Sequence, residues 1–232
     1  ISLIGVFTLV LKKEKLEKVL LYLVSFSVGA LFGDVFLHII PQISDQNKFS
    51  FKIGSLFLSG IIIFFIIEKF VHWHHCHLAE HEHKIKPVVY TNLIGDGFHN
   101  FLDGMIIASA FVISVPLGVA TALAVIFHEI PQEIGDFGVL LYSGLTTKKA
   151  LLFNFLSALL SIAGAVAALL LSQTVAGLSV VLLAIAGGGF IYIAGSDLIP
   201  ELHKECRWNC SFYQLIAIVL GIAMMGGLLL LE

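Results

Sequence analysis

The sequence predicts an all-α polytopic membrane protein, and three features support this fold class. Of the 232 residues, 58% are hydrophobic and only 12% are charged, which is too little charge to cover a soluble domain of this size. The apolar residues fall into runs of about 20, the length that a helix needs to cross a bilayer. Such runs recur along the whole chain, so we expect one transmembrane domain over residues 1–232.

Seven apolar runs are long enough to span the membrane. They cover residues 19–43, 52–71, 90–114, 117–143, 149–172, 175–200 and 212–231. Residues 1–11 are also apolar but too short, and we interpret them as the end of a truncated first helix. The expected total is therefore eight helices. No signal-peptide cleavage pattern follows this segment.

The loops between these helices differ strongly in basic residues. Eleven Lys and Arg residues lie in the first, third, fifth and seventh loops, whereas the second loop holds only Lys48 and Lys52. Basic residues concentrate in cytoplasmic loops, so both termini are expected to be extracytoplasmic. We therefore expect a multi-pass protein of the plasma or inner membrane. No basic patch interleaved with aromatic residues suggests a nucleic-acid partner.

Two polar clusters interrupt the spans 90–114 and 117–143. They contain His99, Asn100 and Asp103 in the first span, and His128, Glu129 and Gln132 in the second. His99 and Asp103 are one helical turn apart and can offer two ligand atoms to one ion. The same spacing separates His128 from Gln132. Each ionisable group at membrane depth costs about 2.5–3.5 kcal/mol, which makes these clusters a functional-site hypothesis.

A divalent cation explains these clusters better than mutual pairing does. No Lys or Arg lies within the two spans to neutralise the carboxylates, so a metal ion or protons must do so. A single buried polar residue often only bonds a neighbouring helix, but a group of this size favours a metal site. Pro131 removes one backbone hydrogen bond and frees the carbonyl near position 127. This loosens the helix where ligands must release an ion.

Two motifs resemble those of the ZIP (Zrt-, Irt-like protein) metal transporters: His99-Asn100-x-x-Asp103-Gly104 and His128-Glu129-x-Pro131-Gln132-Glu133. Residues 29–41, 154–157 and 197–201 are also similar to that family, so the resemblance covers nearly the full chain. It implies an eight-helix bundle with both ends outside. It also implies uptake of zinc or a related divalent metal into the cytosol.

The resemblance also implies roles for the clustered residues. The primary site would be lined by His99, Asp103, His128 and Gln132, with Asn100 and Glu129 in an adjacent second site. Gln132 departs from the family pattern, which usually has His or Glu there, and this leaves open whether one metal or two are bound. Imidazole, carboxylate and amide donors suit Zn²⁺, Fe²⁺, Mn²⁺ or Cd²⁺ as transported substrate. Zinc is the first choice, from the resemblance.

Other polar residues suggest a path for the ion. Asp34 and His38 share one helical face and could receive the incoming ion. Residues on the cytoplasmic side of the motifs could relay it outward, and these are Asp96, Glu133, Asp136, Asp197 and Glu201. Solvation of a helix end is the competing explanation, above all for Glu201.

The third loop, residues 72–86, is rich in histidine. Its members are His72, His74, His75, His77, His81 and His83. Such a tract binds transition metals without needing a fold. We expect this cytoplasmic segment to capture released ions or to report their concentration, the alternative being an inert flexible loop.

A short repeat bears on the mechanism. The segment His38-Ile-Ile-Pro41-Gln42 is similar to Asp197-Leu-Ile-Pro200-Glu201, and the two spans run in opposite directions. We therefore expect an inverted repeat of helices 1–3 and 6–8 around the central helices 4 and 5. Such a repeat provides alternating access to a site at the midplane.

Two other functional classes remain as alternatives. An intramembrane zinc hydrolase typically carries His-Glu-x-x-His, but residues 128–132 read His-Glu-Ile-Pro-Gln and lack the second His, so we do not expect an enzyme. A non-transporting metal sensor would leave the ligand set at membrane depth unexplained. The sequence leaves open channel or carrier kinetics, proton coupling, and whether the chain forms a homodimer.

Overall fold

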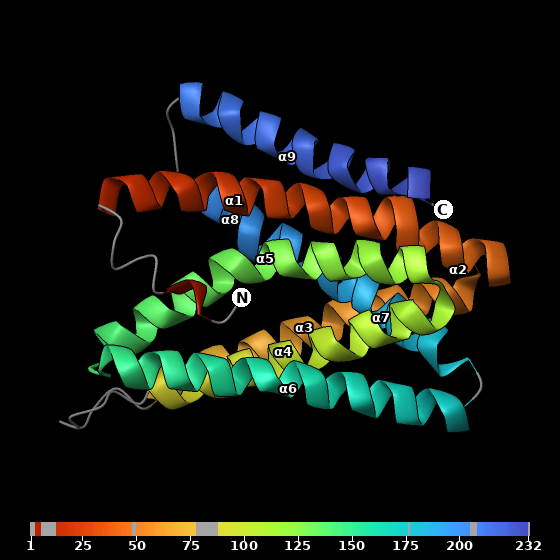
Figure 1. Cartoon of the computed structure of the whole chain (residues 1–232), viewed down its shortest axis with the longest axis horizontal. Coiled ribbons are helices and arrows are strands. Elements are labelled where there is room, and N and C mark those ends of the chain that lie inside the picture. The colour runs from red at the N-terminus through yellow and green to blue at the C-terminus, as the bar shows by residue number, and fades with distance from the viewer. Residues whose placement is uncertain are drawn as a thin grey trace.

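The computed structural model describes residues 3–5, 13–47, 50–77, 88–175, 177–204 and 208–231, and this part of the chain is helical without strands. The elements are α1 (Lys13–Gly33), η2 (Asp34–Ile39), α2 (Ile40–Asn47), α3 (Phe51–His77), α4 (Val88–Ile113), α5 (Val115–Tyr142), α6 (Thr147–Thr174), α7 (Leu178–Tyr192), η3 (Ile193–Leu198), α8 (Ile199–Leu202), α9 (Trp208–Leu228) and η4 (Leu229–Leu231). Successive long helices run in opposite directions through one bundle (Figure 1). The predicted all-α fold is confirmed.

Six described helical stretches are long and apolar enough to cross a membrane. They cover residues 18–44, 51–69, 115–141, 147–174, 178–202 and 208–228, and each corresponds to a predicted span. The seventh predicted span is α4, which has 26 residues and a length of about 39 Å. It is not among the six, because polar residues cluster in its middle. The first predicted helix, residues 1–11, lies largely outside the described residues.

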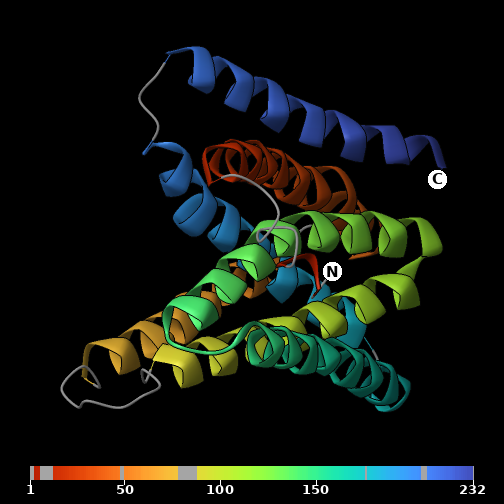
Figure 2. The same ribbon diagram turned by 60° about the vertical axis from the view of Figure 1, so that its left-hand side comes forward.

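The outermost helices carry the side chains expected at a lipid surface. α6 and α9 lie on opposite sides of the bundle in two views (Figure 1 and Figure 2). Large apolar residues are exposed along α6, among them Leu152, Phe155, Leu159, Ile162, Val166 and Leu170. In a membrane these side chains would contact acyl chains. The polar residues of the sequence motifs are turned inward instead.

Two helix pairs touch through matching glycines. In the α1–α9 pair, a Cβ placed on Gly29 would lie 2.0 Å from the Ile218 carbonyl oxygen. In the α3–α7 pair, a Cβ on Gly188 would lie 2.0 Å from the Phe57 carbonyl oxygen. The reverse contacts match as well, Gly221 meeting Phe26 and Gly60 meeting Ile185. The two pairs therefore have equivalent packing, with backbone against backbone.

Both halves also contain a π-helical segment before a proline. η2 ends at Ile39, just ahead of Pro41, and η3 ends at Leu198, just ahead of Pro200. Proline lacks an N–H group and its ring crowds the carbonyl one turn earlier, so the preceding turn widens. Together with the glycine contacts, these segments relate α1 and α3 to α7 and α9, whereas the first helix of the predicted inverted repeat lies largely outside the described residues.

Candidate metal site

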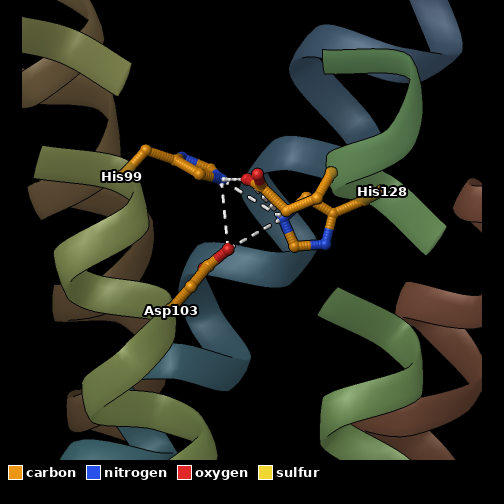
Figure 3. Close-up of side chains that lie close together, drawn as sticks. His99, Asp103 and His128 are labelled. Atoms are coloured by element: carbon orange, nitrogen blue, oxygen red, sulfur yellow. Dashed lines mark hydrogen bonds and ion pairs between the residues drawn. The ribbon is translucent and has the colours of Figure 1, made fainter. Parts of the chain in front are cut away.

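Helices α4 and α5 bring four ligand-type side chains together inside the bundle. His99 and Asp103 come from α4, and His128 and Glu129 come from α5. One ligand atom of each lies within 4.8 Å of the others. Figure 3 shows His99 and Asp103, one turn apart on their helix as the sequence predicts, pointing toward His128 on the facing helix.

Five of the six distances among the four donor atoms are close to the edges of a tetrahedron around zinc. The two Nε2 atoms, of His99 and His128, are 3.1 Å apart. Asp103 Oδ2 lies 3.7 Å from the His99 nitrogen and 3.3 Å from the His128 nitrogen. Glu129 Oε1 lies 3.5 Å from the His99 nitrogen and 3.9 Å from the His128 nitrogen. Donors around zinc have edges of about 3.3–3.6 Å, because metal–ligand distances are about 2.0–2.2 Å. A zinc-sized ion could thus contact all four groups after small adjustments.

A backbone contact fixes the tautomer of one imidazole. His128 Nδ1 lies 3.2 Å from the Ala124 carbonyl oxygen, which can only accept, so Nδ1 carries the proton. In the neutral imidazole this leaves the Nε2 lone pair of His128 available to the cluster. This arrangement, in which one ring nitrogen is hydrogen-bonded and the other faces the ion, is usual for histidine ligands.

Aromatic rings enclose both imidazoles, a feature that the sequence analysis missed. The Phe64 ring packs edge-on against His99 with centroids 6.4 Å apart, and Phe190 packs against His128 at 5.8 Å. Gly189 makes room for Phe64, since a Cβ there would lie 2.3 Å from the ring. Each ring covers one side of its imidazole, and the His99 side chain stays 15% exposed.

The carboxylates of the cluster are buried, and no Lys or Arg of the described residues forms an ion pair with them. Both carboxylate oxygens of Asp103 and Oε1 of Glu129 lack a hydrogen-bond partner among the described residues. Within 4.0 Å of these carboxylates, the described groups that can carry a positive charge are the imidazoles of His99 and His128. Buried anions without compensation are costly, so the arrangement favours a bound cation.

Asn100 and Gln132 lie outside this four-residue cluster. The Asn100 amide donates to the carboxylate of Asp96 at 2.8 Å and to its carbonyl oxygen at 3.2 Å. Gln132 lines a cavity next to His99. The resemblance to the family motif implied a second site for Glu129, whereas in the structure its carboxylate faces both imidazoles.

A cavity of about 420 Å³ connects His99 with the surface. Its walls include Asp96 and Asp136, and the exposed residues Glu68 and Asp197 lie at its outer part. Three predicted exit residues, Asp96, Asp136 and Asp197, are therefore grouped around one space. Glu68 was not predicted, although its position just before the histidine-rich loop could have indicated it; its carboxylate accepts a hydrogen bond from Tyr192.

The other two predicted exit residues do not line this cavity. Glu133 is buried and accepts a hydrogen bond from Asn154 Nδ2 at 2.9 Å. Glu201 is exposed beside Lys204, with which it forms an ion pair. The position of Glu201 at the end of α8 agrees with the alternative explanation, solvation of a helix end.

The residues predicted to receive the incoming ion are buried in η2. Asp34 accepts a hydrogen bond from Thr121 at 3.3 Å, and His38 Nε2 lies 2.8 Å from the Met225 carbonyl oxygen. Both side chains are shielded from solvent in this conformation.

The prediction for the histidine-rich loop falls outside the described side chains. The backbone of residues 72–77 belongs to α3, and residues 78–87 are not described.

Fold and cluster together define a multi-pass membrane protein with metal-ligand side chains in its interior. Residues 72–229 match the family model described as ZIP Zinc transporter, and the chain belongs to this family. Zinc transporter zipt-7.1 of Caenorhabditis briggsae is 30% identical over 88% of this chain and 69% of its own length. Zinc transporter zipt-7.2 of Caenorhabditis elegans is 32% identical, and the chain spans only 56% of it.

A third relative is matched over almost the whole chain. The Zinc transporter ZIP13 homolog of Drosophila melanogaster is 29% identical over 97% of this chain and 85% of its own length. All three relatives are named as transporters and not as enzymes. The prediction that the chain is not an enzyme is therefore confirmed.

Proposed function

We propose that this protein transports a divalent transition metal, with zinc as first choice, through the cluster of His99, Asp103, His128 and Glu129. The observation that carries this proposal is the set of four donors within 4.8 Å of one another between two helices, where no Lys or Arg of the described residues pairs with the two carboxylates. Two imidazoles and two carboxylates suit Zn²⁺, and they also accept Fe²⁺, Mn²⁺ and Cd²⁺. Asn100 and Gln132 would bind the ion only in a further position or conformation.

The direction of transport in this proposal is into the cytosol. α1, α6 and α9 begin at one end of the bundle, where α3 ends (Figure 1). Five of the six exposed lysines that the structure describes lie at this end: Lys18 in α1, Lys69 in α3, Lys148 and Lys149 in α6, and Lys204 between α8 and α9. The sixth, Lys52, lies at the start of α3. By the positive-inside rule that end is cytoplasmic, which would leave both termini outside. Glu68 and Asp197, at the outer part of the cavity, lie near this end of their helices.

Alternating access is supported by a difference between the two π-helical segments. In η2, Asp34 and His38 are almost fully buried, whereas Asp197 of η3 is exposed and lines the cavity. The two segments occupy equivalent places in the inverted repeat. In a second conformation η2 would line an extracytoplasmic cavity and η3 would be closed, which exposes a midplane site to each side in turn.

Uptake of ⁶⁵Zn²⁺ into proteoliposomes tests this proposal. We expect saturable uptake by the purified protein, with Fe²⁺, Mn²⁺ and Cd²⁺ as competitors that rank the metals. His99→Ala should abolish uptake, and His203→Ala, which changes an exposed histidine outside the site, should not. Normal uptake by the His99→Ala protein would refute the site. Stoichiometric binding without uptake would favour a sensor.

A further inference from the structure

Pro131 leaves one backbone acceptor of α5 without its usual donor. In a regular helix the N–H of residue 131 would bond the carbonyl of Phe127, but proline has no N–H. α5 nevertheless continues from Val115 to Tyr142 through this position. The freed carbonyl belongs to the residue directly before His128, so its environment bears on the metal cluster.

A hydroxyl of α1 occupies this acceptor. Ser27 Oγ lies 2.6 Å from the Phe127 carbonyl oxygen and 2.8 Å from the carbonyl oxygen of Leu23 in its own helix. The hydroxyl has one hydrogen, which it shares between these two acceptors or donates to one of them. Ser27 is fully buried, and the Phe26 and Phe127 rings pack edge-to-face beside it with centroids 4.7 Å apart.

The helix that presents Ser27 is itself held in place. Gly29 lies against the backbone of α9, so that even a methyl group would not fit between the two helices. α1 is therefore a fixed support, whereas α5 carries two of the four cluster residues. Ser25, also fully buried on α1, donates to Leu21 of its own helix at 2.8 Å and provides a natural comparison.

We propose that Ser27 is a positioning residue: its hydroxyl clamps the carbonyl freed by Pro131 and thereby sets the place of His128 in the metal site. This inference rests on the proposed function for the role of His128. Binding sites need their ligands held within about 0.5 Å of the productive geometry, so a shift of the backbone at Phe127 weakens the site. Without Ser27 the Phe127 carbonyl would be buried and unpaired, which drives such a shift.

Zinc affinity measured in nanodiscs, by competition with a fluorescent chelator, tests the clamp. Ser27→Ala should weaken zinc binding about tenfold, the effect expected when a buried acceptor loses its donor. Ser27→Thr keeps the hydroxyl and should restore binding to within about threefold, and Ser25→Ala should leave it unchanged. Equal affinities for Ser27→Ala and Ser25→Ala would overturn the proposal.

Pro131→Ala provides the decisive control, because it returns the missing N–H to α5. The Phe127 carbonyl is then bonded within its own helix, so adding Ser27→Ala should weaken zinc binding less than twofold. A tenfold loss in both backgrounds would mean that Ser27 acts through packing alone, and the clamp would be refuted.

Thermal unfolding without metal separates this inference from the proposed function. Ser27→Ala should lower the unfolding midpoint more in the Pro131 protein than in Pro131→Ala, whether or not zinc binds. If the wild-type protein bound no zinc but showed this coupling, the proposed function would fail and the clamp would stand. Zinc binding without coupling in either measurement would refute the clamp alone.

Discussion

Replacing Glu129 by Gln tests which residues form the metal site. The substitution keeps the shape of the side chain and removes the charge that lies 3.5 and 3.9 Å from the two imidazole nitrogens. Only Asp103 would remain as an anionic donor in the cluster. Breaking a buried charge pair costs about 3–5 kcal/mol. Because about 1.4 kcal/mol corresponds to a tenfold change in Kd, zinc affinity should fall by about two to three and a half orders of magnitude.

Titration of the purified protein in nanodiscs against a fluorescent zinc chelator measures this loss. Glu201→Gln is the matched control, because it makes the same chemical change at an exposed ion pair outside the cavity. Gln132→Asn should weaken binding less than fivefold if Glu129 completes the site. Unchanged affinity in Glu129→Gln together with a large loss in Gln132→Asn would refute the structural grouping and favour the assignment from the family motif.

Three more predictions follow from the contacts described above. Gly29→Ala should lower the midpoint of thermal unfolding, because the added Cβ would push α1 away from α9 at a cost of about 1–3 kcal/mol. Gly138→Ala is the comparison in the same assay: its Cβ would enter open space, so the substitution should stabilise α5 by about 0.5–1 kcal/mol. Asp197→Asn should slow ⁶⁵Zn²⁺ uptake without changing zinc affinity, and an unchanged rate would remove it from the exit path. Zinc at 100 times its Kd should stabilise the folded protein by about 2.7 kcal/mol, and this gain should vanish in His99→Ala.

The sequence was sufficient for the described helices and for placing His99 and Asp103 together on one face of α4. Apolar runs of spanning length mark the helices, and the spacing of His99 and Asp103 places both on one face regardless of the partner helix. It was not sufficient to choose between Glu129 and Gln132. That choice depends on the rotation of α5 toward α4, which contacts between distant segments determine.

The hydrogen bond of Ser27 to Phe127 was also not predictable from the sequence. The freed carbonyl near position 127 was predicted from Pro131, because proline always removes a donor within its own helix. Its new donor lies 100 residues away in sequence, and no local pattern connects the two. The equivalence of the glycine contacts could have been predicted, because Gly29 precedes Pro41 by the same number of residues as Gly188 precedes Pro200.

The kinds of contact between helices indicate where the bundle can rearrange. α4 is locked to α6 in the way that α1 is locked to α9, since a Cβ on Gly104 would lie 1.8 Å from the Ser161 carbonyl oxygen. Backbones in such contact cannot slide past one another without first separating. α5 meets α1 and η2 through side-chain hydrogen bonds instead, one from Ser27 of α1 to the Phe127 carbonyl oxygen and one from Thr121 of α5 to Asp34 of η2. Ser27 has a second acceptor in its own helix, so its release of Phe127 costs the hydrogen bond of that carbonyl but requires no separation of packed backbones. A rearrangement that opens the site is therefore expected at the boundary between α1 and α5, beside the residue that holds His128 in place.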